Sequence, residues 1–178
     1  MIYYLLLFFM VIYPFFWLRI IKNWRWDEII KNLFPKTTGF KIETIGALKL
    51  FTLLFIAFII VSVIINTLGL NDLDKVSSVI NNQTKPNTLI FFIGSLFVVL
   101  FIEEFFFRAF LQKRIGIILS TMVYALLHLG YASIAEIIGA FFLGLVLAYW
   151  YKRNNSLIQN YFGHLMYDLI AIAIYVFF

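Results

Sequence analysis

The sequence predicts an all-α fold, a polytopic membrane helix bundle of about six transmembrane helices that forms a single domain over residues 1–178. Composition is the first observation behind this prediction. Hydrophobic residues make up 63% of the chain and charged residues 13%, whereas soluble domains contain about 45–50% apolar and about 25% charged residues. The second observation is that the apolar residues occur in runs close to the roughly 20 residues that a spanning helix needs. A soluble fold of this size could not bury 22 Phe, 10 Tyr and 4 Trp, so we expect lipid to cover much of the surface.

Six apolar stretches carry the predicted spans, and the fourth is short for a spanning helix. They cover residues 2–21, 47–68, 88–111, 115–129, 132–151 and 156–178. The first stretch lacks a basic segment before it and a small-residue cleavage site after it, which favours a retained membrane helix over a signal peptide. Residues 22–49 mix aromatic, apolar and charged side chains and predict a short amphipathic helix on the interface, ended by the break at residues 35–39. Residues 71–87 predict a polar loop.

The basic residues predict the orientation in the cell membrane. Twelve of the 14 Lys and Arg residues lie beside the first, third and fifth connections. Because basic loops stay in the cytoplasm, residues 22–49 form a cytoplasmic connection, and the N- and C-termini of this multi-pass protein lie outside the cytoplasm. The chain has no basic stripe with interleaved aromatic residues on a soluble element, so no nucleic-acid partner is expected. It has no cysteine, which excludes disulfides and thiolate metal sites.

Ionisable residues gather in the last four apolar stretches. An ionised side chain at the centre of a bilayer costs about 2.5–3.5 kcal/mol, so such residues usually have a function. The depth of each residue can be estimated from the nearest Lys or Arg at the end of its helix, at 1.5 Å per residue. Most of these ionisable residues then lie about 15–22 Å deep, within one layer of about 7 Å. The set consists of Glu103, Glu104, Arg108, His128, His164 and Asp168. Glu136, near the outer end of the fifth stretch, is interpreted as an interfacial charge.

The spacing within this set indicates which groups can act together. Glu104 and Arg108 are four residues apart, so they can pair on one helix face and leave Glu103 as the freer carboxylate. His164 and Asp168 are also four apart and can point into one cavity.

A carboxylate beside a histidine can take a proton from water, and a second imidazole beside an Asp can stabilise an oxyanion. The chain has no Cys, and Ser120 lies about 12 Å of helical rise from His128. The set therefore favours hydrolysis by activated water over covalent catalysis.

Three motifs resemble one family. Residues 103–108, EEFFFR, match the EExxxR motif of the CPBP family of CAAX proteases and bacteriocin-processing enzymes, also called the Abi family. Residues 124–128, YALLH, resemble its FxxxH motif with Tyr in place of Phe, and residues 164–168, HLMYD, resemble its HxxxN/D motif. The resemblance covers about residues 91–174 and places the motif-bearing catalytic core in residues 88–178.

The resemblance implies a CPBP-type intramembrane protease, a hydrolase that cleaves a peptide or protein substrate at the membrane. Glu103 would be the general base that activates water, with His128 helping to hold it. His164 and Asp168 would form the oxyanion-stabilising side, although an ionised Asp donates no hydrogen bond and could instead orient His164. The supporting residues would be Glu104, Arg108 and Tyr124.

The cofactor and the substrate can also be stated as expectations. No metal is expected because the HExxH spacing is absent, and zinc is the alternative, held by Glu103, His128 and His164 with an open position for water. Membrane lipid and a peptide or protein are the expected partners, the latter a bacteriocin leader, a pheromone precursor or a prenylated tail. Two other functions stay open: a bacteriocin self-immunity protein that acts by binding, and a transporter, which the lack of an evident inverted repeat disfavours.

Overall fold

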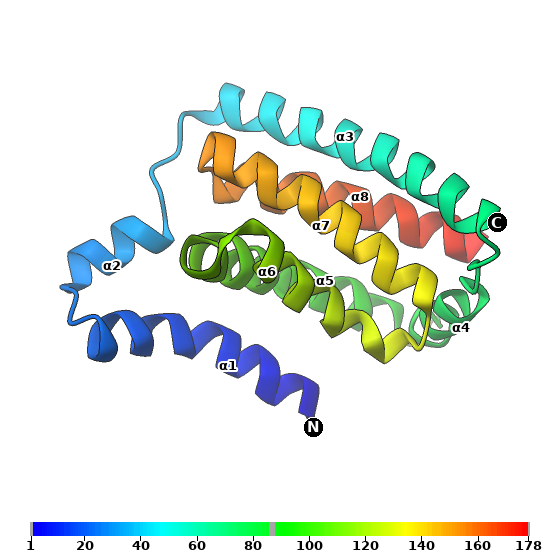
Figure 1. The fold of residues 1–178 in the computed structure, drawn as a ribbon, viewed down its shortest axis with the longest axis horizontal. Coiled ribbons are helices and arrows are strands. Elements are labelled where there is room, and N and C mark those ends of the chain that lie inside the picture. The colour runs from blue at the N-terminus through cyan, green and yellow to red at the C-terminus, as the bar shows by residue number, and fades with distance from the viewer. Residues whose placement is uncertain (1, 86–87, 178) are drawn as a thin grey trace.

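The fold is a helical bundle, as predicted. The computed structural model describes residues 2–85 and 88–177, and within those ranges every regular element is a helix. The elements in chain order are α1 (Ile2–Phe16), η1 (Trp17–Ile21), α2 (Trp26–Leu33), α3 (Phe40–Thr67), α4 (Asp74–Gln83), α5 (Leu89–Glu103), η2 (Glu104–Leu111), α6 (Gln112–Leu126), η3 (Leu127–Tyr131), α7 (Ile134–Asn154) and α8 (Leu157–Phe177). The amphipathic helix α2 lies at one end of the bundle and α4 at the other (Figure 1).

Four helical stretches of the described residues are long and apolar enough to cross a membrane. They are Tyr4–Ile21, Phe40–Thr67, Leu89–Tyr131 and Ile134–Asn154. The 21-residue helix α8 is not among them, and it carries the polar side chains of the candidate site. The chain is therefore a membrane protein with a helical bundle, and the number of six crossings stays a prediction.

The stretch Leu89–Tyr131 is not one straight rod, because the chain turns back at Gly116. The rings of Phe107 and Tyr124 have centroids 5.3 Å apart, whereas the two positions would lie about 26 Å apart in a straight helix. Gly116 has φ 85° and ψ 174°, a backbone conformation that is essentially confined to glycine. Gly116 lies at the start of the fourth apolar stretch, two residues after the predicted gap at residues 112–114.

Two boundaries differ from the sequence prediction. Helix α3 begins at Phe40 rather than at residue 47. Hydropathy marks only the part of a helix that lies in lipid, and α3 extends beyond that part with more polar turns. Residues 71–87, predicted as a polar loop, contain helix α4, which buries Val76 and Ile80. Only these two side chains of α4 are buried. Two apolar positions are too few to show a helical period in the sequence.

The core holds the helices that carry the predicted motifs. One cluster joins α1 and α2 to η2, where Phe105, Phe107 and Phe110 are almost fully buried. A second joins α3 to α7 through Leu50, Leu54 and Leu147. Large apolar side chains are exposed along the outer faces of α1, α3, α5 and α6, as expected of helices that face lipid.

Candidate active site

The centre of the site is a buried ion pair in η2, which has π-helical geometry, a rare conformation that is frequent at functional sites. The side chains of Glu104 and Arg108 are both completely buried, and Arg108 Nε lies 3.4 Å from Glu104 Oε2. The guanidinium of Arg108 also lies over the ring of Tyr124, 4.9 Å from its centroid. The predicted pairing of Glu104 with Arg108 is thus present, and it takes place in the core.

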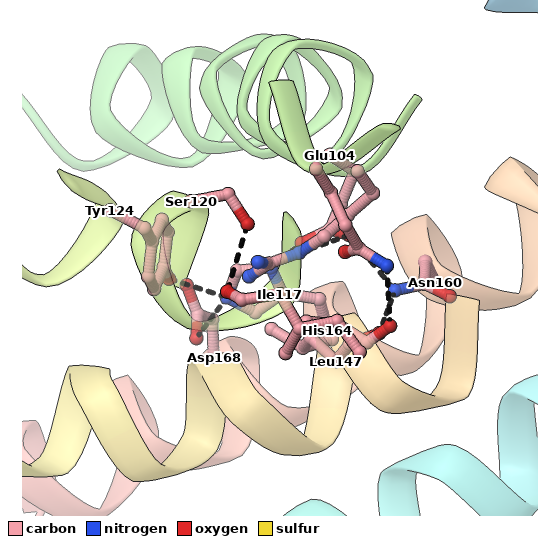
Figure 2. A network of polar contacts seen from close by, with 11 residues as sticks. Glu104, Ile117, Ser120, Tyr124, Leu147, Asn160, His164 and Asp168 are labelled. Carbon is pink, nitrogen blue, oxygen red and sulfur yellow. Dashed lines mark hydrogen bonds and ion pairs between the residues drawn. The ribbon is translucent and has the colours of Figure 1, made fainter. Parts of the chain in front are cut away.

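Glu104 also binds helix α8, which sequence spacing did not indicate. His164 Nδ1 lies 2.9 Å from Glu104 Oε1, and Asn160 Nδ2 donates to Glu104 Oε2 at 3.0 Å. Asn160 Nδ2 also donates to the carbonyl of Leu147 on α7 at 2.9 Å. Figure 2 shows these contacts converging from three helices. Glu104 is therefore the shared partner that holds α8 and its histidine in place.

The other ring nitrogen of His164 faces two further polar groups. His164 Nε2 lies 3.6 Å from Asp168 Oδ1 and 3.5 Å from the hydroxyl of Tyr124, as Figure 2 shows. His164 is thus placed between the carboxylates of Glu104 and Asp168, an arrangement that favours a positively charged imidazolium with both nitrogens protonated. Such a group donates hydrogen bonds and can stabilise an oxyanion.

Glu103 lies at the edge of this cluster. Its side chain is half-buried. His164 and Arg108 attract its negative charge, and Asp168 and Glu104 repel it. Among the contacts of the described residues, none is a direct hydrogen bond or ion pair of Glu103. Its carboxylate is therefore free to bind water, as expected for the less constrained member of the glutamate pair.

His128 approaches the cluster from the end of α6. Its ring stands edge-on to that of Tyr124 with centroids 5.0 Å apart. His128 Nδ1 lies 3.3 Å from the carbonyl oxygen of Tyr124. A carbonyl only accepts hydrogen bonds, so Nδ1 carries the proton of a neutral His128 and Nε2 is the basic nitrogen.

The structure changes the interpretation of two polar residues. Glu136, interpreted from the sequence as an interfacial charge, has Oε1 3.9 Å from His128 Nε2. Asn160 was not recognised at all, although it lies four residues before His164, on the same helix face. The signal was available in the spacing Asn160, His164 and Asp168, since polar side chains rarely recur at every fourth position of a membrane helix.

Ser120 is not placed as a nucleophile. It is buried, and its hydroxyl donates to the carbonyl of Ile117 at 3.0 Å (Figure 2). In ranges 2–85 and 88–177, no three His, Cys, Asp or Glu side chains form a group that could hold a metal ion. The absence of a metal, and zinc on Glu103, His128 and His164 as its alternative, both stay predictions.

Fold and site together define a membrane protein with a buried carboxylate and imidazole cluster. Residues 85–170 match the family model described as type II CAAX prenyl endopeptidase Rce1-like. This part of the chain therefore belongs to the CPBP family, and the resemblance noted in its motifs is confirmed. Comparison with curated proteins and with solved structures found no significant match. The family that this part of the chain matches consists of CAAX-type membrane endopeptidases, which implies a peptide or prenylated protein as the class of substrate.

Proposed function

We propose that the chain is an intramembrane endopeptidase that hydrolyses a peptide or protein at the membrane with water activated by Glu103 and His128. The observation that carries this proposal is the position of His164 between Glu104, 2.9 Å away, and Asp168, 3.6 Å away. That arrangement supports His164 as a fixed hydrogen-bond donor beside the free carboxylate of Glu103. Amide hydrolysis requires both a donor to the oxyanion and a base that activates water.

The proposed reaction begins with a water molecule bound between Glu103 and His128. Glu103 takes a proton from the water, and the resulting hydroxide attacks the carbonyl carbon of the scissile peptide bond. The carbonyl π electrons move to oxygen, and His164 and the hydroxyl of Tyr124 donate hydrogen bonds to the oxyanion. Glu103 then passes its proton to the leaving nitrogen, the C–N bond breaks, and a carboxylic acid and an amine are released.

The supporting residues act on the geometry of His164 in this proposal. Glu104 holds Nδ1, and Arg108 balances the charge of Glu104 in the core. Asp168 orients the opposite edge of the ring and does not itself donate to the oxyanion. No step requires a metal, so we expect a zinc chelator to leave the rate unchanged.

The substrate class of the family suggests the first probe. We propose to use an internally quenched peptide that ends in a farnesylated cysteine and three further residues, with purified full-length protein in lipid vesicles. Glu103→Gln keeps the size of the side chain but removes the base, so kcat should fall by at least about 100-fold. Asp27→Asn is the matched control, because Asp27 is an exposed carboxylate on α2.

Two results would count against the proposal. Cleavage by Glu103→Gln at the wild-type rate would exclude Glu103 as the base. Protection of cells from a bacteriocin by a Glu103→Gln protein that no longer cleaves would instead favour a self-immunity protein that acts by binding.

A further inference from the structure

The first turn of α7 is capped by other residues, so the carboxylate of Glu136 is not needed to cap this helix. Residues 133–136 are Ser-Ile-Ala-Glu. Ser133 is the N-cap, and its hydroxyl oxygen accepts from the Glu136 amide at 3.1 Å. A serine N-cap followed three residues later by glutamate is the sequence of a capping box, in which the glutamate carboxylate would turn back to the N-cap amide.

The carboxylate of Asp72, from the connection between α3 and α4, serves this helix end instead. Its two oxygens accept from the hydroxyl of Ser133 at 2.6 Å and from the amides of Ile134 and Ala135, each at 3.1 Å. Because Asp72 supplies the negative charge at the N-terminus of α7, the helix does not need the carboxylate of Glu136 for its cap.

The carboxylate of Glu136 faces the candidate site. Glu136 Oε1 lies 3.9 Å from His128 Nε2, and the side chains are only 25% and 17% exposed. The like charge of Asp168 repels that of Glu136. A carboxylate that is only 25% exposed and is not used as a cap is costly to keep ionised there unless it has a partner of opposite charge.

We propose that Glu136 is a positioning residue of the endopeptidase site, whose negative charge beside Nε2 orients the His128 ring and stabilises its protonated form. In that form Nε2–H is shared between the Glu136 carboxylate and the oxygen of the reacting water, whose proton goes to Glu103, while Nδ1–H stays bonded to the Tyr124 carbonyl. This inference rests on the proposed function, and it adds to the motif residues a carboxylate that lies outside all three motifs.

The test compares Glu136→Gln with Ser133→Ala in the full-length protein. Glu136→Gln removes the charge but keeps the shape. Because it disturbs the support of a general base that itself contributes on the order of 10²- to 10⁴-fold, kcat for the farnesylated peptide should fall at least about tenfold. KM should stay within about twofold, and Glu136→Asp should recover part of the loss. Ser133→Ala weakens the same helix end, so it should lower the melting temperature and leave kcat within about twofold.

A second measurement does not depend on cleavage. His128 and His164 are the two histidines of the chain, so ¹⁵N spectra of the imidazoles are simple to assign. Glu136→Gln should move the His128 nitrogen signals and Ser133→Ala should not.

The outcomes separate the two proposals. Unchanged kcat and unchanged His128 signals in Glu136→Gln, with a Glu103→Gln protein that is inactive, would overturn the role of Glu136 alone. An equal loss of kcat in Ser133→Ala would show that Glu136 acts only through the helix end. Failure of the wild-type protein to cleave the peptide would count against the proposed function, while the spectra would still decide whether Glu136 controls His128.

Discussion

Removal of the buried charge on Glu104 should be the most damaging single change in the site. Glu104→Gln keeps the size of the side chain but leaves Arg108 and His164 without their shared counter-charge. At the observed 3.4 Å between Arg108 Nε and Glu104 Oε2, two unit charges interact by about 5 kcal/mol at an effective dielectric constant of about 20. Breaking a buried pair by removing one partner typically costs about 3–5 kcal/mol. We therefore expect the free energy of unfolding to fall by about 3–5 kcal/mol.

The assay is reversible unfolding of the purified protein in mixed detergent micelles, followed by the fluorescence of its 4 Trp residues. Asp27→Asn is the control, since Asp27 pairs with Arg25 at 3.2 Å but the two side chains are 54% and 82% exposed. An exposed pair contributes at most about 1 kcal/mol. The double variant Glu104→Gln/Arg108→Met removes both charges, so it should cost less than the sum of its single variants.

One result would refute this reasoning. A loss below about 1 kcal/mol in Glu104→Gln, equal to that of the exposed control, would mean that the carboxylate does not hold the cluster together. Strict additivity in the double variant would lead to the same conclusion.

Three further predictions concern backbone, chemistry and pH. Gly116→Ala should cost about 1–3 kcal/mol of unfolding free energy because of its φ of 85°, whereas Gly94→Ala, inside α5 with nothing within 4 Å of the new methyl group, should stabilise by about 0.5–1 kcal/mol. Tyr124→Phe should lower kcat at least about tenfold through the loss of an oxyanion donor, whereas Tyr161→Phe, whose ring packs against α5, should leave it unchanged. Hydrogen bonds from the serine hydroxyl and the amides at the start of α7 hold the pKa of Asp72 well below its usual 3.8. The ionised Asp72 therefore stabilises the fold fully above about pH 3.8, and this contribution is lost as the pH falls below that value. The free energy of unfolding should then decrease more steeply with acid in the wild type than in Asp72→Asn.

Much of the bundle could be predicted because lipid imposes a simple rule on sequence. Apolar runs of about 20 residues mark spanning helices, and the gap between the third and fourth runs, at residues 112–114, predicted a break close to Gly116. Helix α4 was missed because its two buried residues, Val76 and Ile80, are too few to show a period among polar neighbours. The start of α3 was placed too late because polar turns continue a helix beyond the lipid.

The sequence alone also selected the residues of the candidate site, since the cost of an ionised group in lipid singles out the few that are present. It identified Glu103, Glu104, His128, His164 and Asp168 and the pairing of Glu104 with Arg108, which depends on local spacing.

Only the tertiary structure decided which partner each group has across helices. That Glu104 binds His164 and Asn160, and that Glu136 faces His128, depends on how α6, α7 and α8 rotate against η2. Helix rotation is set by the packing of many side chains at once, so no short-range pattern in the sequence encodes it.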